Sequence, residues 1–362
     1  MVLSAAMALE FFPLEFHSGY QSQQERQLKL PPPVQLFGIE EYLAQLLQVL
    51  ALPRPIWLAS IEGLAGIGKT ALAGHLLRQK ALADQFYQMG WVSAKPHAFF
   101  PRSGLRQKLS PSLSPETLID TLLEQFDQPF VLTRPAQEKR VILTQLLKSK
   151  PYLVVIDNLE TWLDYQALLP LLRELANPSK FLLTSRHSLQ AYSDIFCCPL
   201  SPLNQVTSIQ FIRAEAWRHK ISQLAGAAEA KLNQIYETVG GYPLALKLVI
   251  GQTAVQPLSF VLERLKRMQP KNIADNYTYI YWQSWQSLSE IGRQTLLAMP
   301  LADGGSIDQL LALTELEPDQ LKPVLELLSL LSLVQIQGEP EAGRYSIHPL
   351  TEIFLLHEAI QR

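Results

Sequence analysis

Short, unbroken apolar runs alternate with stretches of helical periodicity in the first half of the chain. The runs occupy residues 56–61, 89–93, 152–157, 181–186 and 195–198. Such runs are typical of strands buried on both faces, whereas half-exposed strands alternate apolar and polar residues. Helical segments fall between them, at residues 71–78, 115–126 and 137–148. This order predicts an α/β fold in which helices cover both sides of a parallel sheet.

The pattern changes after residue 200, where helical spacing takes over. The candidates for a buried core in residues 201–270 are Ala214, Trp217, Leu232, Ile235, Leu246 and Leu262. Their spacing predicts a small helical domain. Residues 271–362 then show a helix, a turn at residues 303–305, two helices and a hairpin through residues 333–337 and 344–347, an order that resembles a winged helix.

The N-terminal residues have little pattern. Residues 1–30 show no clear periodicity and are predicted to form a loosely ordered tail, and the three prolines that follow make a stiff spacer. We therefore expect four parts: a tail at 1–30, a sheet domain at 31–200, a helical domain at 201–270 and a winged-helix domain at 271–362.

The segment Gly63-Leu64-Ala65-Gly66-Ile67-Gly68-Lys69-Thr70 fits the phosphate-binding loop pattern at every fixed position, and it lies between a predicted strand and a predicted helix. Glycines let the backbone curl so that several N–H groups converge on a phosphate, and the helix start that continues into Ala71 adds further N–H groups and a positive dipole end. Lys69 supplies a full charge for the β- and γ-phosphates, and the Thr70 hydroxyl is placed to bind Mg²⁺. The alternative, a glycine-rich turn that binds nothing, leaves these matches unexplained.

Asp157 ends a buried apolar run. Open α/β sheets place ligand chemistry at the carboxyl ends of their strands. A carboxylate delivered there beside a phosphate loop is the Walker B arrangement, in which the acid helps to hold Mg²⁺. A strand-end Asp that caps the next helix is the alternative.

Two further residues are candidates for phosphate chemistry. Many P-loop ATPases have an acid that polarises the attacking water at the position that Asn158 occupies here. Glu160, two residues further on, is therefore the candidate for that role. The alternative is that Glu160 is a solvated acid in a loop. Arg186 ends the neighbouring run and could reach a γ-phosphate. The alternative is an exposed Arg at the start of a helix.

Composition narrows the class of partner. The net charge is −2 and the pI is about 6.4. The chain therefore lacks the excess of positive charge with which proteins bind nucleic acid or an anionic membrane. The two cysteines, Cys197 and Cys198, are adjacent and cannot easily bridge each other. No stretch is long and apolar enough to span a bilayer, and the apolar start lacks a basic segment, so we expect a cytoplasmic protein.

Five motifs together resemble the STAND/NB-ARC family of signal-transducing ATPases, relatives of plant disease-resistance proteins and apoptosome scaffolds. Besides the phosphate loop, the residues are Phe37-Gly38-Ile39-Glu40-Glu41, where the family usually has Arg in place of Ile39, and the run from Leu153 to Glu160, which resembles a bacterial variant. Gly240 to Leu246 resembles a motif whose proline, here Pro243, packs on adenine. Tyr345 to Leu350 resembles the winged-helix motif whose histidine, here His348, contacts the β-phosphate of ADP.

The resemblance implies a switch that binds adenine nucleotide with Mg²⁺. ADP would hold a closed monomer, and ATP would favour an open form that assembles with itself or with partner proteins, with weak ATP hydrolysis. Two other classes stay open. A DNA-binding regulator would use residues 318–328 as its recognition helix. This segment holds one cation, Lys322, whereas groove binding usually needs several, so we expect the helix to pack against the protein. A turnover ATPase would need an efficient water-activating acid.

Overall fold

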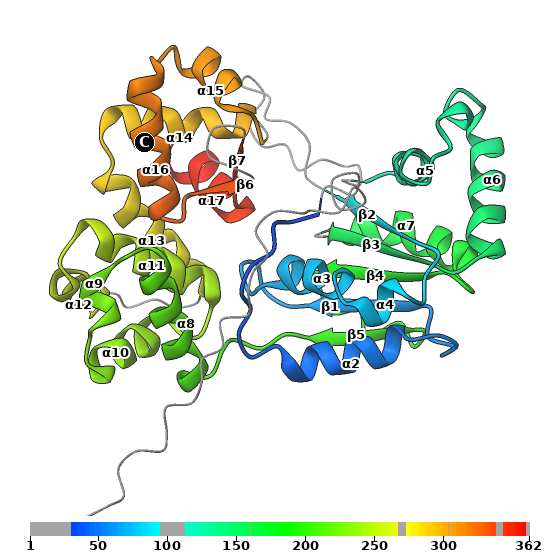
Figure 1. The fold of residues 1–362 in the computed structure, drawn as a ribbon, viewed down its shortest axis with the longest axis horizontal. Coiled ribbons are helices and arrows are strands. Elements are labelled where there is room, and N and C mark those ends of the chain that lie inside the picture. The colour runs from blue at the N-terminus through cyan, green and yellow to red at the C-terminus, as the bar shows by residue number, and fades with distance from the viewer. Residues whose placement is uncertain are drawn as a thin grey trace, which may run out of the picture.

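The computed structural model describes residues 30–94, 113–159, 161–266, 273–302, 304–337 and 343–359. Its first half is a five-stranded, all-parallel sheet in the order β2-β3-β4-β1-β5 (Figure 1). The strands are β1 (Leu58–Glu62), β2 (Gln88–Ser93), β3 (Tyr152–Leu159), β4 (Lys180–Ser185) and β5 (Ile195–Pro199). The prediction of an α/β fold with a parallel sheet is confirmed.

Helices cover both faces of this sheet because the strands are apolar on both. Along β3, Leu153 and Val155 belong to one core, whereas Val154 and Ile156 belong to the other. The first core is closed by α2 (Glu40–Leu50), α3 (Lys69–Leu77) and α4 (Lys80–Ala83). The second is closed by α5 (Pro115–Gln125), α6 (Ala136–Ser149) and α7 (Trp162–Leu175). Successive side chains of a strand point to opposite faces, so one run supplies both cores.

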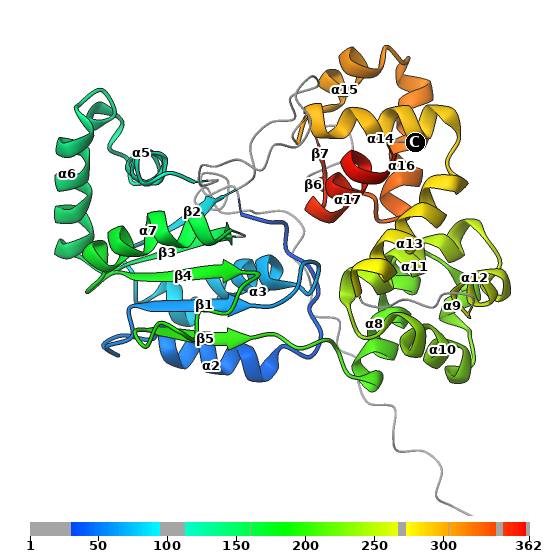
Figure 2. The same ribbon diagram turned by 180° about the vertical axis from the view of Figure 1, so that it is seen from behind.

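The second half of the molecule is mostly helical and lies beyond the carboxyl ends of the strands (Figures 1 and 2). Its first helices are α8 (Gln205–Arg218), α9 (Ser222–Ala225), α10 (Glu229–Val239), α11 (Pro243–Val255) and α12 (Leu258–Lys266). They are followed by α13 (Ile273–Ser287), α14 (Glu290–Ala302), α15 (Ile307–Thr314), α16 (Pro318–Leu330), the antiparallel pair β6 (Val334–Gln337) and β7 (Arg344–Ile347), and α17 (Pro349–Phe354). One continuous hydrophobic cluster runs through both groups.

Two details of this half differ from the sequence prediction. Trp217, expected in the core, is 81% exposed, and Ala214, also expected there, is only partly buried, because α8 turns Ile212 and Ala216 inward. Before the turn near residue 304 there are two helices rather than one. The break comes at Ser289, whose hydroxyl accepts a hydrogen bond from the Gly292 N–H and so starts α14. The predicted tail falls on residues outside the described part, apart from Leu30.

Candidate nucleotide-binding site

The phosphate loop joins β1 to α3 at the carboxyl edge of the sheet. Gly63, Gly66 and Gly68 have φ values of 143°, 76° and 109°, which L-residues with a side chain rarely adopt. The Lys69 ammonium donates to the carbonyl oxygens of Gly63, at 2.7 Å, and Leu64, at 3.0 Å. Its charge therefore lies against the loop backbone, and the Ile67 side chain of the same loop is buried.

Thr70 and Asp157 are 87 positions apart in sequence but meet at this edge. The Thr70 hydroxyl donates to Asp157 Oδ1 at 2.8 Å, and the Thr184 hydroxyl donates to the same oxygen at 2.6 Å. Burial raises the pKa of the Asp157 carboxyl, while hydrogen bonds from Thr184, Thr70 and the Asn158 N–H and the charge of Lys69 act in the opposite direction. A hydroxyl beside a buried carboxylate is an oxygen donor set that suits Mg²⁺. The residues present therefore fit this ion.

Asn158 has a structural role at the end of β3. It adopts a left-handed backbone, with φ of 65°, where the pairing register between β3 and β4 shifts. Its side-chain amide donates to Ser93 Oγ on β2 at 3.1 Å, and its backbone N–H donates to Thr184 Oγ1 at 2.9 Å. The prediction for Glu160 lies outside the described residues.

Arg186 and His348 come to the same region from opposite halves of the chain. Arg186 follows β4 directly, and His348 is the N-cap of α17. Burial, together with the nearby positive charges of Arg186, Lys69 and Lys247, lowers the pKa of His348 to about 3. His348 Nδ1 accepts a hydrogen bond from the Leu350 N–H at 3.1 Å. The ring is therefore neutral and carries its proton on Nε2.

Pro243 is the first residue of α11 and lies beside the phosphate loop. The N–H of the next residue, Leu244, donates to the Gly66 carbonyl at 3.3 Å. A Cβ at Gly66 would lie 2.8 Å from Leu244 Cβ and 2.9 Å from the Tyr277 hydroxyl of α13. The loop is thus in contact with the second half of the molecule through both α11 and α13.

The structure therefore gathers Lys69, Thr70, Asp157, Arg186 and His348 around one loop. Sequence reasoning missed Thr184, Tyr277 and Lys247, which also lie in this region. The available signal for Thr184 was its position, where the buried run turns from apolar to polar at the carboxyl end of the strand. No local signal marks Tyr277 or Lys247, because their relation to the loop depends on how the two halves pack.

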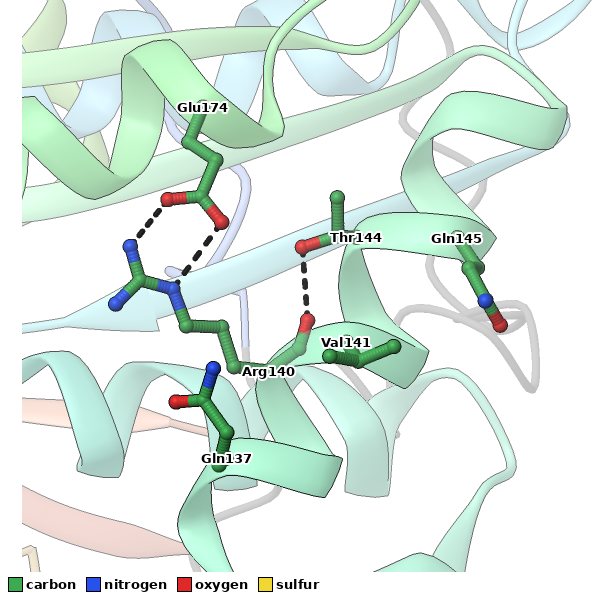
Figure 3. A pocket seen from close by; sticks show the side chains of 6 residues that line it. All are labelled: Gln137, Arg140, Val141, Thr144, Gln145 and Glu174. Atoms are coloured by element: carbon green, nitrogen blue, oxygen red, sulfur yellow. Dashed lines mark hydrogen bonds and ion pairs between the residues drawn. The ribbon is translucent and has the colours of Figure 1, made fainter.

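A separate surface hollow lies between α6 and α7, at the end of the molecule away from the phosphate loop (Figures 1 and 3). Arg140 of α6 and Glu174 of α7 form an ion pair across it, and Thr144 Oγ1 donates to the Arg140 carbonyl at 2.8 Å. Both charged side chains are more than 40% exposed. None of the predicted phosphate-binding residues lines this hollow.

A parallel sheet with a phosphate loop between β1 and α3, and with an acid at the end of β3, defines a P-loop nucleotide-binding protein. Within that class, residues 39–218 match the NB-ARC domain, and this part of the chain belongs to that family. In the described residues, no helix combines the length and apolar character that a membrane crossing requires.

Similar proteins agree with this assignment. A probable disease resistance protein of Arabidopsis thaliana is 28% identical over 243 residues, which is 64% of this chain and 26% of that protein. The disease resistance protein RPP8 of the same plant is 29% identical over 231 residues, 60% of this chain and 23% of its own length. The chain thus spans about a quarter of the length of these relatives.

A solved structure shares the fold over most of the chain. It is a Signal Transduction ATPase with Numerous Domains (STAND) protein with a tetratricopeptide repeat sensor, from Pyrococcus horikoshii. The TM-score is 0.59 at 15% identity, over 91% of this chain and 43% of that one. This likeness concerns the fold, and the match of residues 39–218 confirms the predicted relation to NB-ARC proteins.

Proposed function

We propose that this chain is a nucleotide-dependent switch in signalling, closed with ADP and opened by ATP. The observation that supports it best is the convergence of Lys69, Arg186 and His348 at a loop that also contacts α11 and α13. A phosphate chain bound there would touch both halves of the molecule. The identity of its terminal group could then decide how the halves pack.

Each residue of the site has a defined role in binding the nucleotide. The loop N–H groups and Lys69 bind the phosphates, and Pro243 packs on the adenine. His348 donates from Nε2 to the β-phosphate of ADP, and Arg186 binds the γ-phosphate of ATP. The Thr70 oxygen and the Asp157 carboxylate would hold Mg²⁺, which would neutralise phosphate charge.

The magnitudes require several of these interactions to act together. Moving a two-state equilibrium from mostly closed to mostly open takes about 5.5 kcal/mol of differential binding. One charge-assisted hydrogen bond from Arg186 supplies only about 1.5 to 3 kcal/mol. Loss of the His348 hydrogen bond and the free energy of assembly, with further copies or with partner proteins, must supply the rest. Slow hydrolysis suits this role, because the ATP state must persist long enough to be recognised.

Calorimetry of ADP and a non-hydrolysable ATP analogue, both with Mg²⁺, tests the proposal. We expect Lys69→Ala to abolish binding of both nucleotides. We expect His348→Ala to lower the affinity for ADP. We expect Arg186→Ala to lower the affinity for the ATP analogue by about 10- to 100-fold, which corresponds to the loss of one charge-assisted hydrogen bond. Its affinity for ADP should change little. Lys322→Ala, which removes an exposed cation on α16, is the control and should bind as wild type does. Unchanged ADP affinity in both Lys69→Ala and His348→Ala would contradict the proposal.

The structure gives less support to a DNA-binding role for α16. Leu321, Leu325 and Leu328 of this helix are buried in the core. Its exposed side carries Lys322 together with the acids Asp319 and Glu326. Groove binding usually needs several cations to contact phosphates, so we keep the switch as the proposed function.

A further inference from the structure

Thr184 lies at the end of β4 and is 1% exposed, next to Asp157, which is 2% exposed. Its oxygen accepts a hydrogen bond from the Asn158 N–H at 2.9 Å, and its hydroxyl donates to Asp157 Oδ1 at 2.6 Å. A hydroxyl has a single hydrogen. Because the Asn158 N–H approaches the oxygen as a donor, that hydrogen is directed to the carboxylate.

The shift in strand register explains why a side chain is needed at this place. Regular parallel pairing would send backbone N–H groups of β3 to carbonyls of β4, but the register changes between Ile156 and Leu159. The left-handed turn at Asn158 redirects its N–H group. Thr184 satisfies this buried donor and at the same time contacts the acid beside it.

The second hydroxyl on the same oxygen belongs to Thr70, which donates to Asp157 Oδ1 at 2.8 Å. Since the Thr70 hydrogen is held by the carboxylate, the lone pairs of the Thr70 oxygen are turned away from it. A carboxylate rotated out of this position would release the Thr70 hydroxyl to turn. The orientation of both metal-binding oxygens therefore depends on what fixes Asp157.

We infer that Thr184 is a positioning residue of the Mg²⁺ site. The Thr184 side chain holds Asp157, and through Asp157 also Thr70, in the orientation that receives the ion. This rests on the proposed nucleotide binding with Mg²⁺. Thr184 touches neither nucleotide nor metal in this role. It acts through the carboxylate, as outer hydrogen-bond partners of metal ligands generally do.

The test measures the affinity for the ATP analogue by calorimetry with Mg²⁺ and again with EDTA, so that the ratio gives the gain from the metal. Thr184→Val keeps the shape of the side chain but removes the hydroxyl. We expect it to lower the ratio of affinities with and without Mg²⁺ by about tenfold, which is the lower end of the effects seen when an outer hydrogen-bond partner of a metal ligand is lost. We expect its affinity in EDTA to stay close to that of wild type. Thr184→Ser, which keeps the hydroxyl, should restore the gain. If Thr184→Val does not fold, Thr184→Ala carries the same expectation.

Ser93→Ala is the matched control. It removes the hydrogen bond that the Asn158 side chain donates to Ser93 Oγ but leaves both hydroxyls that donate to the Asp157 carboxylate, so the gain from Mg²⁺ should stay at the wild-type value. Equal weakening of Thr184→Val with and without Mg²⁺, an unchanged gain, or failure of Thr184→Ser to restore it would overturn the inference alone. A wild-type protein that binds no nucleotide would overturn the proposed function and the inference with it.

Discussion

His348 shows how a single residue acquires its properties from the packed state. An exposed imidazole titrates near pH 6.5, but in the folded protein burial lowers the pKa of His348 to about 3, with Arg186, Lys69 and Lys247 acting in the same direction. Between these values the unfolded chain carries a proton on His348 and the folded protein does not. Stability contributed by this residue is therefore complete above about pH 6.5 and is lost as the pH falls toward 3.

We predict that thermal denaturation shows this titration. The unfolding free energy of the wild type should fall below pH 6.5 by up to about 1.4 kcal/mol per pH unit from this residue. His348→Asn removes the titration but keeps an N-cap for α17, so its melting temperature should depend less steeply on pH between 6.5 and 4.5. Equal slopes for the two proteins would show that His348 is not held neutral.

At the scale of elements, the packing of α11 against the end of α16 depends on Gly251. A Cβ at this position would lie 2.6 Å from the Leu330 carbonyl oxygen and 2.7 Å from Leu331 Cα, both backbone atoms. We predict that Gly251→Ala lowers stability by about 1 to 3 kcal/mol, because overpacking outweighs the helix propensity gained. Chemical denaturation measures this difference.

Gly292 of α14 is the control for Gly251. It is also buried within a helix, but its added Cβ would have its nearest neighbours at 3.4 Å. Gly292→Ala should therefore be neutral or slightly stabilising. Similar losses in both variants would mean that the packing of α11 on α16 is not the cause.

At the scale of the whole molecule, Gly66 is where the sheet half and the helical half meet. We predict that Gly66→Ala loosens this interface, because its Cβ would collide with Leu244 and with the Tyr277 hydroxyl. Small-angle scattering should show a larger radius of gyration than for the wild type. Gly68→Ala is the control, since it carries the same kind of backbone strain at φ of 109° but meets nothing within 4 Å. Expansion in both variants would assign the effect to loop strain.

The elements and the local motifs could be read from the sequence because their signals are local. Buried runs such as that of β3 are apolar whatever surrounds them, and the phosphate loop needs its glycines and Lys69 at fixed spacing. Trp217 was misplaced because periodicity along α8 does not say which side of a helix meets its neighbours. The register shift at Asn158 was likewise hidden, since it arises between two strands.

The α/β order and the phosphate loop follow from the sequence alone, because each strand, helix and loop signal is carried by residues close together in the chain. The match of residues 39–218 to the NB-ARC domain likewise needs only the sequence. It took the folded molecule to place Thr184 and Thr70 on one oxygen of Asp157, and His348 near Lys69 and Arg186. These relations join residues far apart in the chain. They depend on which strands pair and how the two halves pack, which no local pattern encodes.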